Sequence, residues 1–151
     1  MHKETYVDDY LYELVQEASD AILISDYQGI IQFWNRGAEL IFGYATNEAV
    51  GQSLDLIIPE NLRARQWEGY HRVMATGDTR YKTGLLTSPG IRKDATRVSL
   101  EFSMVLLRDD SGDIRGCASI MRNVTERWKK EKELNDRLAA CEAQKAAHPN
   151  I

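Results

Sequence analysis

The feature that most constrains the fold is a β-hairpin pattern with helical patterns directly behind it, all within residues 21–51. Two β-branched and aromatic runs, 21–25 and 30–34, flank a short polar segment that ends in Gly29. This arrangement predicts two antiparallel strands joined by a tight turn, because glycine adopts the backbone conformations that such turns need. The core of the domain is therefore expected to begin with a hairpin.

Two short helices are predicted immediately after the hairpin. Asn35 can hydrogen-bond to the backbone that follows it and so start a helix, which Gly43 ends. Thr46 is placed to cap a second helix over residues 47–50, which ends at Gly51. A hairpin followed by two short helices is the predicted organisation of this part of the chain.

A longer helix and three strands are predicted in the second half of the chain. Pro59, followed by an acidic residue, predicts the start of a helix that runs to about Thr76. Alternating apolar and polar residues predict a strand over residues 97–107. The other strands are expected over residues 81–88, where Pro89 and Gly90 interrupt the pattern, and over 114–124. Two strands, several helices and three strands predict an α+β fold, with a five-stranded antiparallel sheet and the helices on one face.

Helices are also predicted at both ends of the chain. Residues 5–19 carry apolar side chains at helical spacing, and Thr125 can cap a long charged helix. Within that helix Leu134, Leu138 and Cys141 are separated by four and three residues, the spacing of a coiled-coil seam. The predicted organisation is a flanking helix in residues 1–19, a central domain over 20–124, and a C-terminal helix with a frayed tail over 125–151.

Composition and charge favour an ordinary globular domain. The chain has 151 residues, 43% of them hydrophobic and 28% charged, which suits one domain with its own core. Its net charge of −4 provides no basic surface for nucleic acid or an anionic membrane. No apolar run has the length of a membrane span, and the N-terminus lacks a signal peptide, so the cytoplasm is the expected compartment. Two cysteines, Cys117 and Cys141, are too few for a disulfide framework or a zinc site.

The sequence carries no motif of a catalytic site. Nucleotide-binding glycine loops, the hydrolase nucleophile motif and the metalloprotease zinc motif are all absent from it. Of its three histidines, His2 and His148 lie near the ends, so a histidine-based catalytic site would depend on His71. The chain is therefore predicted not to be an enzyme.

Residues 26–44 carry the pattern D-x-x-G-x-I-x-x-W-N-x-x-A-E-x-x-F-G-Y, and shorter characteristic segments follow it in order. These segments are residues 51–52, 58–60, 92–94 and 121–127. In this order and spacing the chain resembles the PAS domain family over residues 14–128, which implies the PAS fold. One departure is Ala95, where the family usually has glycine after a Lys-Asp pair. Alanine tolerates a left-handed backbone poorly, so the turn is expected to differ there.

The resemblance implies a sensory or interaction module of bacterial-type signal transduction, for example in the regulation of transcription. A small ligand or cofactor would occupy an apolar cavity between the sheet and its helices. The terminal helices of a homodimer would pass the signal to a kinase or a transcription regulator. Candidate cavity residues are Trp67, Tyr70, His71, Met74, Phe102, Met104, Ser119 and Met121, with Ile24, Phe42 and Ile57 from the first half. Candidate dimer and output residues are Leu11, Leu14, Trp128, Leu134 and Leu138.

The sequence leaves the ligand open. One alternative is a haem-based gas or redox sensor, with His71 as an axial ligand of the iron and Met104 opposite it. Flavin is less favoured, because residues 51–54 lack the reactive cysteine of the light-sensing family members, although noncovalent flavin stays open. A further alternative is a PAS domain with a filled core that only dimerises.

Overall fold

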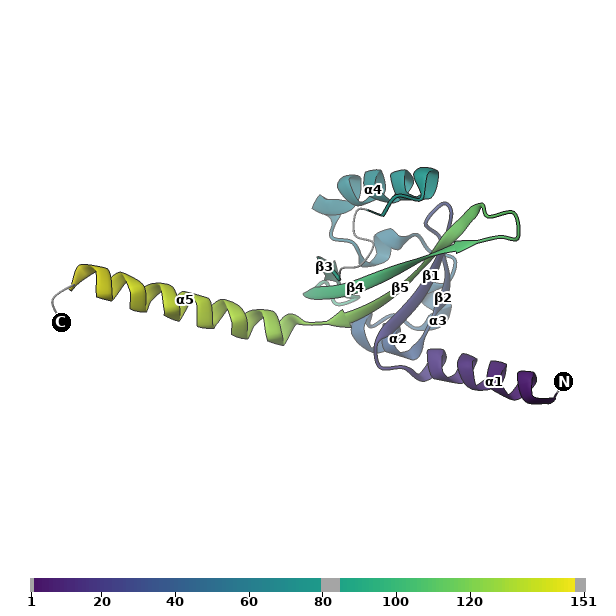
Figure 1. Cartoon of the computed structure of the whole chain (residues 1–151), viewed down its shortest axis with the longest axis horizontal. Helices are drawn as coiled ribbons and strands as arrows, with labels where there is room; N and C mark the ends of the chain where they lie inside the picture. Colours follow the sequence, from purple (N-terminus) through teal and green to yellow (C-terminus); the bar gives the residue numbers. More distant parts are fainter. Residues whose placement is uncertain (1, 80–84, 149–151) are drawn as a thin grey trace.

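The computed structural model describes residues 2–79 and 85–148. In chain order the elements are α1 (His2–Glu17), β1 (Ala21–Asp26), β2 (Ile31–Trp34), α2 (Arg36–Phe42), α3 (Thr46–Ala49), η1 (Leu54–Ile57), η2 (Glu60–Leu62), α4 (Arg63–Thr76), β3 (Leu86–Ile91), β4 (Arg97–Arg108), β5 (Ile114–Asn123) and α5 (Thr125–Ala147). The strands form one antiparallel sheet in the order β2-β1-β5-β4-β3. Helices α1 and α5 extend away from the sheet in opposite directions (Figure 1). The predicted α+β architecture, with a helix at each end, is confirmed.

The hairpin of β1 and β2 carries much of the core. Its turn contains Gly29 with a φ of +82°, and Asp26 Oδ1 accepts hydrogen bonds from two backbone N–H groups of the same turn. Trp34, at the end of β2, is fully buried, and its ring centroid lies 5.4 Å from that of Phe42 in α2. These two rings join Leu23 of β1 in one hydrophobic cluster, so α2 packs against the sheet through the predicted apolar positions.

Asn35 connects three parts of the chain, although the sequence predicts for it only the start of a helix. Its Oδ1 accepts hydrogen bonds from Ala38 N at 2.9 Å, which caps α2, and from Ile22 N at 2.8 Å in β1. Its Nδ2 donates to Val15 O at 2.8 Å, in α1, and to Asp20 O at 3.0 Å. Because this buried amide uses both its donors and its acceptor, it fixes the position at which α1 leaves the domain.

Two predicted helix caps are wrong. Thr46 is the first residue of α3 rather than its cap, and its hydroxyl donates to Trp34 O at 3.1 Å. Thr125 is likewise the first residue of α5, and its hydroxyl donates to Asn123 Oδ1 and accepts from Ser99 N. In both cases residues of the preceding or neighbouring strands hold the hydroxyl, so it does not turn back on its own helix.

The helix predicted from Pro59 is divided into two parts. A short 3₁₀ helix, η2, comes first, and α4 begins at Arg63. Leu62 N donates to Pro59 O at 2.9 Å, which is the i to i+3 pattern that often precedes an α-helix. The predicted end at Thr76 is confirmed.

The strand predicted over residues 81–88 lies further along the chain. β3 runs through Pro89 and Gly90, which are predicted to interrupt it, and residues 80–84 lie outside the described part. β3 is an edge strand that pairs with β4, with Pro89 opposite Ser99. An edge strand tolerates proline because one side of its backbone needs no partner in the sheet.

The turn before β4 corrects another expectation. Ala95 has a φ of +69°, so it keeps the left-handed conformation that alanine disfavours. The turn is intact, with Arg92 N donating to Thr96 O and Ala95 N donating to Arg92 O, both at 2.9 Å. Hydrogen bonds from Thr96 also hold the pKa of Asp94 below its usual value. The backbone therefore accommodates alanine as local strain and does not change its path.

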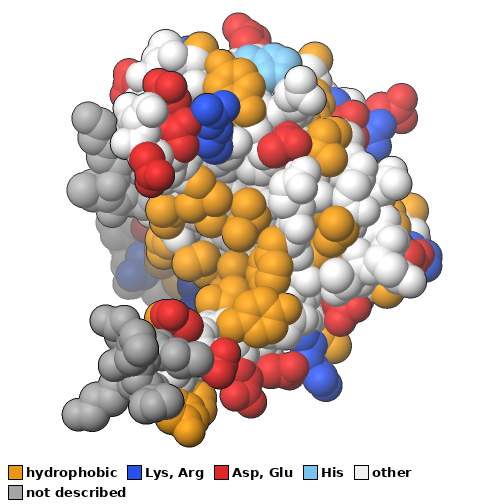
Figure 2. All heavy atoms as spheres, turned by 90° about the vertical axis from the view of Figure 1, so that its right-hand side faces the viewer, with side chains coloured by type: hydrophobic (Ala, Val, Ile, Leu, Met, Phe, Trp, Pro, Cys, Tyr) orange, Lys and Arg blue, Asp and Glu red, His pale blue; other side chains and the backbone are white. Residues whose placement is uncertain are grey.

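Several apolar side chains are exposed on the described part of the chain. Val105 of β4 and Ile120 of β5 lie on the outer face of the sheet, opposite the face that carries the core. In Figure 2, which views the side where α1 and the β4–β5 hairpin end, hydrophobic side chains gather in the middle of the molecule. The exposed apolar residues of the terminal helices are Tyr6, Val7, Tyr10, Leu11, Tyr12 and Leu14 in α1, and Trp128, Leu134 and Leu138 in α5.

Candidate functional site

A cleft of about 600 Å³ lies between α4 and the sheet. Residues of α4 form one wall, and the segment that contains η1 and η2 forms another. The floor consists of Leu100, Phe102 and Met104 from β4, Ser119 and Met121 from β5, and Ser25 from β1. An apolar lining with a few polar groups is typical of small-molecule sites.

The pairing of β4 with β5 builds the floor. Phe102 lies opposite Met121, and Met104 lies opposite Ser119. Since side chains alternate between the two faces of a strand, all four point to the face that α4 covers. The alternation predicted for β4 therefore brings the four predicted sheet residues together.

Two aromatic side chains hold α4 above this floor. The indole ring of Trp67 packs against Gly29, and its Nε1 donates to Asp55 Oδ1 at 2.6 Å. The hydroxyl of Tyr70 donates to Asp26 O at 2.5 Å. Both bonds tie α4 to the edge of the cleft, at η1 and at the β1–β2 turn, and leave apolar side chains over the floor.

Three neutral polar side chains, Ser25, Tyr70 and Ser119, line the cleft, and the thiol of Cys117 lies next to Ser119. Ser25 Oγ lies 3.0 Å from the Tyr70 hydroxyl, and Ser119 Oγ lies 3.9 Å from Cys117 Sγ. Ser25 pairs with Cys117 across the β1–β5 ladder, and Ser119 is two residues further along β5. Burial raises the pKa of Tyr70 to about 12, and burial also raises the pKa of the Cys117 thiol. All four groups are therefore uncharged near neutral pH.

The structure places most of the predicted cavity residues in this lining, namely Trp67, Tyr70, Phe102, Met104, Ser119 and Met121. Met74 is buried instead and is not among the lining residues. Of the residues named from the first half, Ile57 lines the cleft and Phe42 belongs to the core. Ile24 lies on the other face of the sheet, since it alternates with Leu23 and Ser25.

His71 is exposed and is not a lining residue of the cleft. Its ring centroid lies 5.5 Å from that of Trp67, so it packs beside the indole ring. Within residues 2–79 and 85–148, the cleft lining contains no histidine. A haem in this cleft would therefore find no axial imidazole from the described residues as they are placed.

Sequence reasoning missed Ser25 and the rim of the cleft. Ser25 ends an apolar run and attracts no attention by itself. Its alternation with Ala21 and Leu23, both fully buried, is the signal that places it on the inner face. Arg65 and Arg72, two exposed residues of α4, also border the cleft.

Of the strands of the floor, β5 leads directly into α5, and β4 is bonded to the start of that helix. Val124 N donates to Ser99 O at 2.8 Å, and Ser99 N donates to Thr125 Oγ1 at 3.0 Å. Arg127 forms an ion pair with Glu101 of β4. The first turn of α5 is thus attached to β4 beside the residues that floor the cleft.

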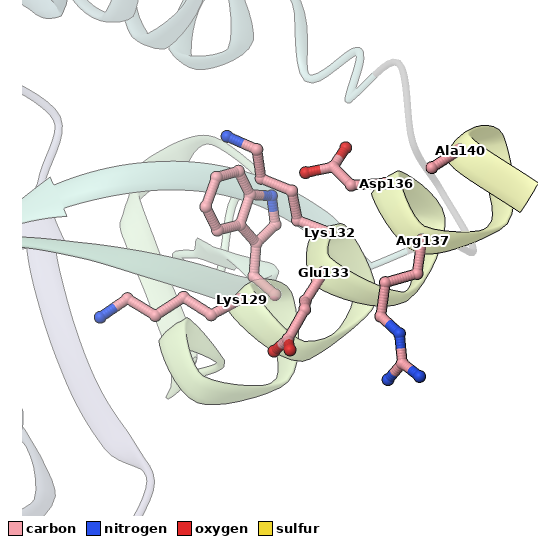
Figure 3. A pocket seen from close by; sticks show the side chains of 7 residues that line it. Lys129, Lys132, Glu133, Asp136, Arg137 and Ala140 are labelled. Carbon is pink, nitrogen blue, oxygen red and sulfur yellow. The ribbon is translucent and has the colours of Figure 1, made fainter.

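A second hollow lies along α5 itself (Figure 3). Lys132 Nζ lies 5.3 Å from the ring centroid of Trp128, which is half exposed. The hollow is lined by Trp128, Lys129, Lys132, Glu133, Asp136, Arg137 and Ala140. Since all of these belong to one helix, the hollow is an open surface of α5 and does not enclose a ligand.

Clusters of metal ligands and membrane-spanning helices are both absent from the described residues 2–79 and 85–148. No group of three or more histidine, cysteine, aspartate or glutamate side chains there is arranged to hold a metal ion. Among the helices of that same part of the chain, none is both long and apolar enough to cross a bilayer.

Comparisons with known proteins agree with this architecture. A family model described as "PAS fold" matches residues 15–129. The Sensor protein FixL of Bradyrhizobium diazoefficiens is 26% identical over 129 residues, which are 85% of this chain and 25% of that protein. The chain therefore spans about a quarter of the length of this curated relative.

Two solved structures share the fold. An RNA-binding Light-Oxygen-Voltage receptor is 22% identical with a TM-score of 0.75, covering 90% of this chain and 38% of that one. A sensory box histidine kinase/response regulator from Burkholderia thailandensis is 17% identical with a TM-score of 0.61, covering 89% of this chain and 98% of that one. At these identities the likeness is one of fold.

Proposed function

This chain belongs to the PAS fold family, and we propose that it is a sensory module that binds a small ligand in the cleft beneath α4. The observation that carries the proposal is the cleft of about 600 Å³, of whose floor strands β5 continues into α5 and β4 is hydrogen-bonded to the first turn of α5. A ligand there would contact Phe102 and Met104, which lie on the same strand as the partners of α5. The function proposed is recognition, followed by transmission to the C-terminal helix.

Transmission would run through the hydrogen bonds between β4 and the first turn of α5. A ligand that fits one arrangement of β4 and β5 better than another shifts the population of the two arrangements. The bonds that Ser99 makes with Val124 and Thr125 would carry that shift into the helix. The size of the effect is limited by the difference between the ligand's affinities for the two arrangements.

We propose that the active form is a homodimer that uses the exposed terminal helices. Leu134 and Leu138 are exposed at coiled-coil spacing on α5, and Leu11 and Leu14 are exposed on α1. An isolated chain that exposes two such apolar stripes is expected to cover them with a second copy. The dimeric helices would act on a kinase or a transcription regulator, in the same protein or in a partner.

The proposed function can be tested by nuclear magnetic resonance with 2-methylnaphthalene as a neutral hydrocarbon probe. We expect saturable changes at the amides of Phe102, Met104 and Ser119, because the probe would lie on the floor of the cleft. Smaller changes are expected at Val124 and Thr125 if β4 transmits to α5. Changes confined to residues outside the cleft contradict ligand binding there, and an unchanged α5 contradicts the transmission step.

A further inference from the structure

Among the described residues, the charges that border the cleft all lie at its rim. In the part of the chain that the structure describes, the buried polar side chains are Ser25, Asn35 and Ser119. Asn35 is fully used in the attachment of α1 and α2, so the two serines are the buried polar side chains that face the cleft. The charged lining residues, Arg65, Glu68, Arg72 and Asp78, are exposed. The interior therefore offers neutral hydroxyl groups and no charge.

Hydrogen-bond accounting separates the two serines. The Tyr70 hydroxyl has one proton, which it donates to Asp26 O at 2.5 Å. With the Tyr70 proton on Asp26 O, the Ser25 hydroxyl has two acceptors for its own proton, the Tyr70 oxygen at 3.0 Å and Cys117 O at 3.5 Å. Ser25 and Tyr70 are thus satisfied by each other and by the backbone.

Among the residues that the structure describes, Ser119 has no comparable partner. Its side chain is 6% exposed, and the polar atom within hydrogen-bonding reach of its hydroxyl is Cys117 Sγ at 3.9 Å. Sulfur is a weak hydrogen-bond partner, so this buried hydroxyl keeps most of its capacity both to donate and to accept. A buried hydroxyl without an oxygen or nitrogen partner costs free energy until something in the cleft supplies one.

We infer that the cleft binds a neutral, largely apolar ring compound that carries one hydroxyl or carbonyl oxygen, and that this oxygen hydrogen-bonds to Ser119. The inference rests on the proposed function, because it specifies the ligand of the same cleft. Trp67 and Tyr70 line the cleft from α4 and Phe102 lines it from the floor, so flat aromatic surfaces face the ligand from both sides.

An anionic ligand fits the interior poorly. A carboxylate placed beside Ser119 would lose its hydration and find only neutral hydrogen-bond partners there. Without a positive charge nearby, most of the free-energy cost of burying the carboxylate would remain. The raised pKa values of Tyr70 and Cys117 agree with an uncharged interior. A neutral hydroxyl or carbonyl oxygen can therefore hydrogen-bond to Ser119 without the cost of burying a charge.

Three ligands with the same ring system test the inference: 2-naphthol, 2-methylnaphthalene and 2-naphthoate. Titrations followed by amide chemical shifts would give the affinity of the full chain for each. Since one hydrogen bond contributes about 0.5–1.5 kcal/mol, 2-naphthol should bind roughly 2- to 12-fold more tightly than 2-methylnaphthalene. 2-Naphthoate should bind most weakly of the three.

The Ser119→Ala variant should lose the preference for 2-naphthol and keep its affinity for 2-methylnaphthalene. Ser103→Ala is the matched control, because Ser103 lies on the same sheet but on the outer face, opposite Ile120. That variant should bind all three compounds as the unmodified chain does. Thermal unfolding of each variant would verify that both remain folded.

The outcomes separate this inference from the proposed function. If 2-methylnaphthalene binds in the cleft but Ser119→Ala keeps the preference for 2-naphthol, the role of Ser119 is overturned and the cleft remains a binding site. Tightest binding of 2-naphthoate overturns the neutral ligand class and moves recognition to the arginines of the rim. If none of the three compounds binds, the proposed function and the inference both fail.

Discussion

The indole ring of Trp67 lies so close to Gly29 that a β-carbon on Gly29 would stand 2.2 Å from the Cη2 atom of the ring. Gly29 thus has two roles, since it also occupies the β1–β2 turn with a φ of +82°. Trp67 lies 38 residues after Gly29 in the chain. Their contact therefore joins the first turn of the sheet to α4. The position of the wall of the cleft therefore depends on a glycine in the hairpin turn.

Gly29→Ala is expected to lower the free energy of unfolding by more than about 2 kcal/mol, through left-handed strain together with the steric conflict. Gly112→Ala is the matched control, because Gly112 has a φ of +85° and no atom within 4 Å of the position of an added β-carbon. It should cost only about 1 kcal/mol. Denaturant unfolding would measure both.

The steric part of that effect can be isolated in a Trp67→Ala background. Without the indole ring, Gly29→Ala should cost about as much as Gly112→Ala, because the left-handed strain alone remains. An undiminished cost in that background would show that the contact with Trp67 is not the cause.

Ala95→Gly is expected to stabilise the domain. Ala95 has a φ of +69°, so glycine at this position should relieve about 1–2 kcal/mol of backbone strain. Glycine also raises the entropy cost of folding, but only by about 0.4–1 kcal/mol, so the net effect should be stabilising. Thermal unfolding should show a higher midpoint. Ala75→Gly, at an exposed helical position in α4, is the control for the same chemical change and should lower the midpoint. Equal signs for the two variants would contradict the strain at Ala95.

Tyr70 is expected to make stability fall at high pH. Burial raises its pKa to about 12 in the folded chain, whereas an unfolded tyrosine has a pKa of about 10. The unfolded state therefore releases its proton first, and the stabilising contribution is present below about pH 10 and lost as the pH rises toward 12. Unfolding measured from pH 9 to pH 12 should show a smaller decline for Tyr70→Phe than for the unmodified chain.

Replacing Leu134 and Leu138 together by serine is expected to convert a dimer into a monomer. Both side chains are exposed in the single chain, so the substitution removes apolar seam contacts without opening the core. Light scattering would report the mass, and thermal unfolding should stay close to that of the unmodified chain. The control is Lys132→Ser with Asp136→Ser, which has the same spacing off the seam and should remain dimeric. A dimer that survives the leucine substitutions would move the interface to α1 or to the sheet.

Cys141 provides an independent test of the same seam. It follows Leu138 at the next seam position and is exposed, so in a parallel dimer two copies should meet there. The oxidant diamide should join the two thiols in a disulfide, with diamide reduced to its hydrazine, and a non-reducing gel should show a covalent dimer. Cys141→Ser should abolish that band, whereas Cys117→Ser should keep it because Cys117 is buried. Crosslinking that is equally strong in the leucine variant would point to random collision.

Haem added to the purified protein is expected to give the same absorption spectrum with His71→Ala as with the unmodified chain. His71 is exposed and does not line the cleft, so its imidazole should not ligate iron bound there. A Soret band in the unmodified chain that is lost in His71→Ala, with unchanged thermal unfolding, would restore the haem alternative. A spectrum taken before any addition would reveal a cofactor that remains bound through purification.

Much of the fold could be predicted because its signals are local. Gly29 in its turn, Gly43 at the end of α2 and the alternation of β4 each act over a few residues, and all three are present in the structure. The floor of the cleft follows from the same alternation, which aims Phe102 and Met104 to one face. Side-chain direction along a strand is determined by the backbone, so these positions required no knowledge of distant contacts.

The errors lie where a distant partner decides. Thr46 and Thr125 are suited to cap helices, but backbone groups of β2 and β4 occupy their hydroxyls. Pro89 predicts the end of a strand from the sequence. In the structure it lies within β3, because β3 is an edge strand and an edge strand tolerates proline. In each case the local preference is worth about 1 kcal/mol, which a tertiary hydrogen bond or strand pairing can exceed.

The order of most elements and the inward face of the strands could be predicted from the sequence, because turn residues and periodicity act through nearby backbone atoms. The rotation of α4, in contrast, follows from long-range packing, which brings Tyr70 to Asp26 and Ser25 and leaves His71 exposed. Adjacent positions on a helix are separated by about 100°, so a small rotation exchanges the residue that faces the cleft. That rotation depends on contacts with residues far away in the sequence, such as Asp26, which is 44 residues from Tyr70. No local sequence pattern encodes the rotation.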